Sequence, residues 1–210
     1  MRSERGLSLV ELVVVLGIMA TLMTLSMGPF IEWYQGAKLE ERASTLQNTF
    51  KWAQTRAVTG GQVDLVNGKL VAKRLYLAVN TSTRRYRVVE WLDADADKLK
   101  EPSEFALLED GTLGGAWYGA APSVTREVRN ESSSVPQTTF SENACPAATD
   151  APLLAGFQCA RLDDKGFLTE DSGSADVYIT NGAKSCAVSI NPAGVPFLYR
   201  WSDGGWQLVR

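Results

Sequence analysis

The segment from Leu12 to Ile31, which has 20 residues and no charge, limits most strongly what this chain can fold into. As an α-helix it would be about 30 Å long, which matches the hydrocarbon core of a bilayer. Arg2 and Arg5 precede it, and basic residues favour the cytoplasmic side of a membrane. We therefore expect one membrane span, with the rest of the chain on the outer side.

A cleaved secretory signal peptide explains the segment less well. Signal peptides have a shorter apolar region, of about 7–15 residues, followed by a small-x-small cleavage site. Here the apolar segment is longer and continues into an amphipathic pattern. Gly6 lies between the basic start and this segment, and Glu11 is a carboxylate near its beginning. A charge in a membrane helix is costly and usually has a partner, so Glu11 points to more than a simple anchor.

The residues around Gly6 carry a resemblance to a known family. The run Gly6-Leu7-Ser8-Leu9-Val10-Glu11-Leu12 resembles the cleavage and assembly motif of type IV prepilins and of type II secretion pseudopilins. The resemblance implies cleavage between Gly6 and Leu7 by prepilin peptidase and N-methylation of Leu7. It also implies other pilin or pseudopilin subunits and an inner-membrane assembly platform as partners. The chain has Leu7 where the family usually has Phe, and its Pro29 lies one place later than the usual helix-bending proline.

Glu11 fits the role that the resemblance implies. In a filament the N-terminal helices pack in an apolar core, where the new amine of Leu7 and the Glu11 carboxylate are each costly unless paired. A pair within one subunit or with a neighbouring subunit would offset that cost and set the axial register. Glu11 is therefore the predicted assembly residue.

A second pattern predicts that the helix continues beyond the membrane and ends at Gly60-Gly61. Apolar residues spaced by four or three form one helical face. They are Leu39, Ala43, Leu46, Phe50, Ala53 and Ala57. We expect a leader at 1–6, a transmembrane or filament-core helix at 7–31, an amphipathic helix at 32–60, and a periplasmic β-rich head at 61–210.

The head is predicted to be an antiparallel sheet domain. Strands at 63–66 and 70–79 flank Asn67-Gly68, a strong hairpin signal, and a third strand covers 84–92. Two further hairpins are predicted near the C-terminus, with strands at 175–180 and 186–190 and at 197–201 and 206–209. The fold class is therefore α+β, a long helix packed on an antiparallel sheet, which is the pilin fold.

The tract from Leu46 to Val63 resembles the helix end and first strand of FimT/FimU- and GspH-type minor pilins and pseudopilins, as does the order of the C-terminal strands. Between them, residues about 111–151 are rich in Gly, Ser, Thr and Pro, and predict a long surface loop with one strand at Val124 to Val128.

The three cysteines are Cys145, Cys159 and Cys186. On the outer side they would face an oxidising compartment. Cys145 and Cys159 are nearest in sequence, and their disulfide would brace the long loop, but spacing does not fix the connectivity.

Two charged clusters have simpler interpretations than a binding site. Asp93, Asp95, Asp97 and Glu104 resemble a calcium loop, but Lys98 occupies the position that requires glycine. We interpret them as an acidic solvated loop and assign no metal. Arg84, Arg85 and Arg87 lie close together in a chain of net charge −3. They are interpreted as a solvated strand face, and we expect no nucleic-acid partner.

The composition argues against an enzyme. The chain has no histidine, which removes the commonest general base and any Ser/His/Asp or Cys/His set. No cofactor is expected. The sequence thus predicts a minor pilin or pseudopilin subunit that is inserted in a bacterial inner membrane and then enters a filament. A major pilin, or a membrane-anchored binding protein that does not polymerise, is the alternative.

Overall fold

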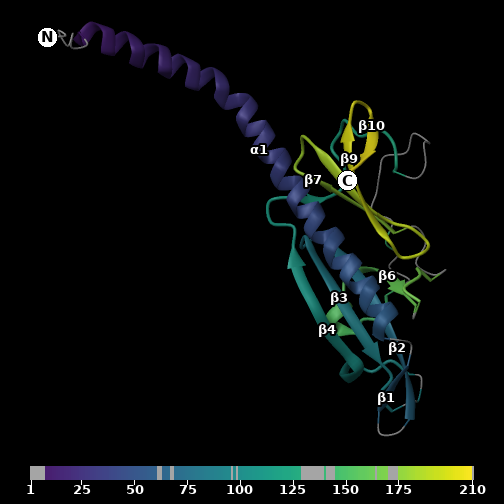
Figure 1. Ribbon diagram of the computed structural model, residues 1–210. Coiled ribbons are helices and arrows are strands. Elements are labelled where there is room, and N and C mark those ends of the chain that lie inside the picture. Colours follow the sequence, from purple (N-terminus) through teal and green to yellow (C-terminus); the bar gives the residue numbers. More distant parts are fainter. Residues whose placement is uncertain are drawn as a thin grey trace, which may run out of the picture. The chain divides into compact units, whose positions relative to one another are not determined.

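The computed structural model describes residues 8–60, 63–66, 69–95, 97, 99–128, 140, 145–163, 165–169 and 175–209. The chain divides into two compact units, Met1–Lys38 and Leu39–Arg210, called here the N-terminal unit and the globular unit and described separately. The predicted α+β layout is confirmed: one long helix comes first and antiparallel sheets follow (Figure 1).

The helix α1 runs from Leu9 to Gly60 and has 52 residues. It ends where the Gly60-Gly61 pair predicted its end; Gly61 lies outside the described residues. The buried residues of α1 are the predicted stripe and no others: Leu39, Ala43, Leu46, Phe50, Ala53 and Ala57. The prediction that this face packs on the sheets is therefore confirmed. The stripe is the face of α1 that is buried in the globular unit.

Two antiparallel sheets form the globular unit. In the first, β1 (Val63–Val66), β2 (Lys69–Asn80), β3 (Arg85–Leu92) and β4 (Phe105–Thr112) follow in order, and β6 (Gln158–Leu162) also pairs with β2. In the second the order is β10 (Gly205–Leu208), β9 (Pro196–Ser202), β8 (Ser185–Ile190), β7 (Ala175–Thr180) and β5 (Trp117–Tyr118). Short 3₁₀ turns lie at Pro102–Glu104 and Pro152–Leu154.

The main core lies between α1 and both sheets. It joins the helix stripe to alternate residues of β2, namely Leu75, Leu77 and Val79, and to buried residues of β7 and β8. Two polar contacts reinforce this packing. Arg56 of the helix pairs with Glu90 of β3 at 3.2 Å, and Arg200 of β9 pairs with Glu40 of the helix at 3.3 Å. The helix is thus held on each sheet separately.

A second core covers the other face of the first sheet. Because successive strand residues point to opposite faces, Tyr76 and Ala78 of β2 face away from the helix. They are buried in a separate cluster with Trp91, Phe105, Ala151, Leu154, Phe157 and others. The covering residues come from the chain that leads into β6. Strands β2 and β3 of the first sheet are therefore buried on both faces.

The predicted hairpins are confirmed, with β1–β2, β2–β3, β7–β8 and β9–β10 each antiparallel. The predicted strand at Val124 to Val128 is wrong. Val124 N–H donates to Ala121 O at 2.9 Å, and Val128 N–H donates to the Tyr178 hydroxyl at 3.0 Å. A turn and a side chain therefore use the backbone donors that a strand ladder would need. Strands β4, β5 and β6 were not among the predicted strands.

A tight three-way contact joins the helix end to two turns. Gly194 has a φ of 75°, and a Cβ added there would lie 1.7 Å from the carbonyl oxygen of Gly166. Gly166 itself packs against Val58 and Gln54 of α1, and Gln54 donates to Ala193 O at 3.1 Å. Because backbone rather than a flexible side chain blocks the position, a larger residue at 194 must displace the turn.

We predict that Gly194→Ala destabilises the globular unit far more than Gly204→Ala. Gly204 has the same φ of 75° but has nothing within 4 Å of an added Cβ. In the control, Gly204→Ala, the free energy of unfolding should fall only by the cost of a left-handed backbone at alanine, about 1–2 kcal/mol. Gly194→Ala should lose roughly a further 1–3 kcal/mol from overpacking. Urea unfolding of the detergent-purified chain, followed by tryptophan fluorescence, measures both. Equal losses would contradict the contact.

Candidate functional site

Ser8 caps the start of α1 and places Glu11 in its first turn. The Ser8 hydroxyl oxygen accepts the Glu11 N–H at 3.2 Å, and the Ser8 carbonyl oxygen accepts the Leu12 N–H at 3.2 Å. Ser8 is therefore the N-cap, and Glu11 is the third helical residue. Gly6 and Leu7, the predicted processing residues, lie outside the described residues.

The pair Ser8 and Glu11 has the spacing of a capping box, in which the cap hydroxyl and a Glu or Gln three residues later satisfy free backbone donors. A carboxylate in the first turn also interacts favourably with the positive end of the helix dipole. The position of Glu11 in the first turn therefore suits its carboxylate to a local function at the helix end, in addition to the predicted pairing with an amine. Ser8 belongs to the quoted motif but had no predicted function, although the S-x-x-E spacing is a capping signal in the sequence.

The first half of α1 suits a lipid environment. By length and composition this helix can cross a membrane, and its apolar window is unburied within the chain. Its hydroxyl groups donate to backbone carbonyls of the same helix: Thr21 to Ile18 O at 2.8 Å, Thr24 to Thr21 O at 2.8 Å, and Ser26 to Met23 O at 3.1 Å. An unsatisfied polar group in hydrocarbon costs on the order of several kcal/mol. These three bonds avoid that cost for the hydroxyls in the span.

A family model described as the prokaryotic N-terminal methylation motif matches residues 1–27. The chain is a type IV pilin-like protein. The matched residues include Gly6, Leu7, the cap Ser8 and Glu11. Membership implies processing by prepilin peptidase and assembly with other pilin subunits, and it points to a structural subunit anchored in a membrane.

No curated protein matches this pilin-like chain, and no solved structure matches it.

In the globular unit, Cys145 and Cys159 are joined by a disulfide, with their Cα atoms 5.1 Å apart and a sequence separation of 14. Cys159 lies in β6 and belongs to the second core, and Cys145 packs against that core. A cross-link of this length stabilises a fold by about 3 kcal/mol when it limits the unfolded chain. Here it holds the segment that covers the outer face of the first sheet.

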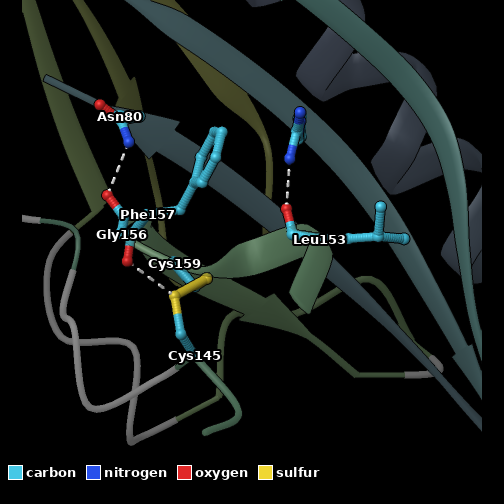
Figure 2. The surroundings of a disulfide bond; sticks show 7 residues. Asn80, Cys145, Leu153, Gly156, Phe157 and Cys159 are labelled. Atoms are coloured by element: carbon cyan, nitrogen blue, oxygen red, sulfur yellow. Dashed lines mark hydrogen bonds between the residues drawn. A yellow bond between two sulfur atoms is a disulfide. The ribbon is translucent and has the colours of Figure 1, made fainter. Parts of the chain in front are cut away.

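Two strand residues hold the same segment by polar contacts (Figure 2). Asn80, at the end of β2, donates its amide N–H to Gly156 O at 2.8 Å, and the Arg87 guanidinium of β3 donates to Leu153 O. The Phe157 carbonyl oxygen lies 3.1 Å from Cys145 Sγ. Because a disulfide sulfur has no proton to donate, the dashed line between these two atoms in Figure 2 marks a close contact and not a hydrogen bond. The segment from Cys145 to Cys159, called here the cover, is thus held by the disulfide and by hydrogen bonds from the Asn80 and Arg87 side chains.

Cys186, in β8, is a free thiol and only 2% exposed. Burial raises the pKa of the Cys186 thiol to about 12, and nearby Glu40 adds to the effect while Arg200 opposes it. A raised pKa keeps the thiol protonated at neutral and mildly alkaline pH. Since the thiolate is the nucleophile, Cys186 is expected to be inert in the folded chain.

The acidic residues between β3 and β4 shape a loop. Asp93, Asp95 and Asp97 place their ligand atoms within 4.8 Å of one another, but Glu104 is outside that group. Both Glu104 oxygens accept protein donors, the Trp91 indole N–H at 2.9 Å and the Ala94 N–H at 2.7 Å. The Asp97 carboxylate accepts the Leu99 N–H at 2.7 Å. Glu104 is therefore used by the protein rather than placed as a calcium ligand.

The three clustered arginines differ in their contacts. Arg85 and Arg87 both pair with Asp110 of β4, through Nε at 3.1 Å and 3.3 Å respectively. The exposed Arg84 lies over the ring of Trp117 at 5.8 Å. Two of the three positive charges therefore have an acidic partner on the same sheet.

We predict different thiol counts for the folded and unfolded chain. Without reductant, the folded chain should label slowly at pH 8 and the unfolded chain should label at one cysteine, because Cys186 is buried and the other two are bonded. Reduction before unfolding should expose all 3 cysteines. Mass spectrometry after alkylation gives the counts.

Cys186→Ala is the control and should show no label without reductant. Rapid labelling of the folded wild type would contradict the buried thiol. Labelling of all three cysteines without reductant would contradict the disulfide and an oxidising location.

Proposed function

We propose that this pilin-like chain is a minor pilin or pseudopilin of the FimT/GspH type, placed at or near the filament tip, where it helps to prime assembly. The filament is a type IV pilus or a type II secretion-type pseudopilus. One observation carries the proposal. The methylation motif supplies Glu11 in the first turn of a helix whose later residues form the core of a β-rich unit.

Features of the globular unit support the minor-subunit assignment. The Leu46–Val63 tract and the C-terminal strand order resemble FimT/FimU- and GspH-type subunits. The segment at about 111–151 runs from the end of β4 toward β6 and includes the short strand β5. Such connecting segments are where binding functions tend to reside, so this one is a natural site for contacts specific to one machine.

The proposed orientation places residues 1–6 on the cytoplasmic side as a leader, 7–31 in the membrane, and the helix 32–60 and head 61–210 in the periplasm. Arg2 and Arg5 in the leader support that direction. The Cys145–Cys159 bond supports it as well, because disulfides persist in oxidising compartments. After release from the membrane, the span would become part of the filament core.

We predict that the mature chain begins at Leu7. Prepilin peptidase acting after Gly6 removes the first six residues, and methylation adds one methyl group to the Leu7 amine. Intact-mass measurement of membrane-extracted protein tests both steps. Gly6→Val should leave the precursor in the inner membrane, because a small residue is needed at the cleavage site. A mature protein that still carries Met1 would contradict the processing.

Glu11 has two candidate functions that the structure makes separable. As a capping residue it needs only an acceptor oxygen, which glutamine also supplies. As the partner of a buried amine it needs a negative charge. Breaking a buried pair by removing one partner costs about 3–5 kcal/mol. Since about 1.4 kcal/mol is tenfold in an equilibrium, that loss would lower incorporation by about a hundredfold or more.

We therefore predict that Glu11→Gln and Glu11→Leu both insert in the membrane, are both cleaved, and both fail to enter filaments. Co-purification with sheared filaments measures incorporation, and membrane levels measure insertion. If Glu11→Gln incorporates normally and Glu11→Leu does not, capping is the function and charge pairing is wrong.

Glu41→Gln is the matched control, since it removes one exposed carboxylate from the same helix and should incorporate like wild type. Normal incorporation of both Glu11 variants would show that Glu11 does not direct assembly. Absence of the wild type from filaments would favour an anchored protein that does not polymerise.

A further inference from the structure

A cluster of aromatic side chains follows the apolar span on α1. Phe30, Trp33 and Tyr34 are exposed by 61%, 63% and 46%. The Phe30 ring lies 6.1 Å from that of Trp33 and is stacked on that of Tyr34 at 6.3 Å. The Lys38 ammonium lies 4.5 Å above the centre of the Tyr34 ring. We call these four residues the interfacial cluster, and all of them belong to the N-terminal unit.

The interfacial cluster lies at a defined distance along the helix. From Leu12, the first residue of the uncharged segment, to Trp33 the helix rises about 32 Å, slightly more than the hydrocarbon thickness of about 30 Å. The first charged residue after the span is Glu32. With the start of the span at one membrane surface, Trp33, Tyr34 and Lys38 therefore fall in the head-group region of the other.

The chemistry of the cluster matches that region. Trp and Tyr are enriched at membrane–water interfaces because their rings are apolar and one edge is polar. Neither the Trp33 indole N–H nor the Tyr34 hydroxyl donates to any residue in the described part of the chain. Both groups are therefore free for lipid carbonyls, phosphates or water. Lys38 adds a cation that can reach a lipid phosphate.

We propose that the interfacial cluster anchors the subunit at the outer head-group layer of the membrane before assembly, and so fixes how far the span is inserted. The proposal rests on the membrane orientation given under the proposed function. The contacts of the Phe30 ring with the rings of Trp33 and Tyr34 favour this use, because packed rings lose less side-chain freedom on meeting lipid than separate ones do. The contacts between the interfacial cluster and the lipid head groups must then break when the subunit leaves the bilayer.

Depth-dependent quenching of tryptophan fluorescence tests the anchor. The full chain is reconstituted in phosphatidylcholine vesicles whose acyl chains carry bromine either close to the head group or close to the chain ends. In the wild type, bromine close to the head group should quench more strongly. Trp33→Phe should remove most of this quenching, because it deletes the reporter and retains an aromatic ring.

Trp52→Phe is the matched control, because it removes an exposed tryptophan of the same helix from the globular unit. It should leave the bromine-dependent quenching unchanged. Stronger Trp33 quenching by bromine near the chain ends would overturn the anchor, as would no Trp33 quenching in a chain that still floats with the vesicles. A chain that fails to float would instead contradict the proposed membrane anchorage itself.

Discussion

One helix must satisfy two different surroundings, and the rest of the structure follows from that constraint. Along its first half, α1 exposes apolar side chains and ties each of three hydroxyls to its own backbone. Along its second half, it buries a single stripe against two sheets. Three of the six stripe residues are alanine, namely Ala43, Ala53 and Ala57, which lets the strands approach the helix closely. The two sheets therefore share a core with one face of the helix, and do not pack only on each other.

The features that local patterns encode were predictable. The stripe from Leu39 to Ala57 follows the helical period, and the Asn67-Gly68 and Asn181-Gly182 pairs mark hairpins. Strand β4 begins Phe-Ala-Leu-Leu and lacks alternation in its sequence. Its pairing with β3 shifts register between Val88 and Val89, so that Leu108 is skipped in the pairing. Strand β6 is specified by its partner β2, about 80 residues earlier. Pairings of that kind depend on tertiary packing, which a single sequence does not reveal.

At the start of the helix, too, some features were predictable from a local pattern and others required the structure. Gly6, Leu7 and Glu11 were identified from a linear motif, and the family match covers them. The structure adds Ser8, whose hydroxyl accepts the Glu11 N–H. The Ser8 hydroxyl caps the helix, and the Glu11 carboxylate lies in the first turn, at the positive end of the helix dipole. The same carboxylate can therefore support the local fold and remain available to a positive group beyond the helix.

The cover over the outer face of the first sheet has a consequence for how the subunit opens. Among the described residues, the second core shares no buried residue with the core under α1, so an opening of the cover leaves the packing of the helix on the sheets unchanged. Such a local opening exposes only the outer face, at a free energy below that of global unfolding. The Cys145–Cys159 bond keeps the detached cover within reach of β6 and makes reclosing a short search. This layer is therefore the part of the globular unit whose opening the disulfide limits most directly.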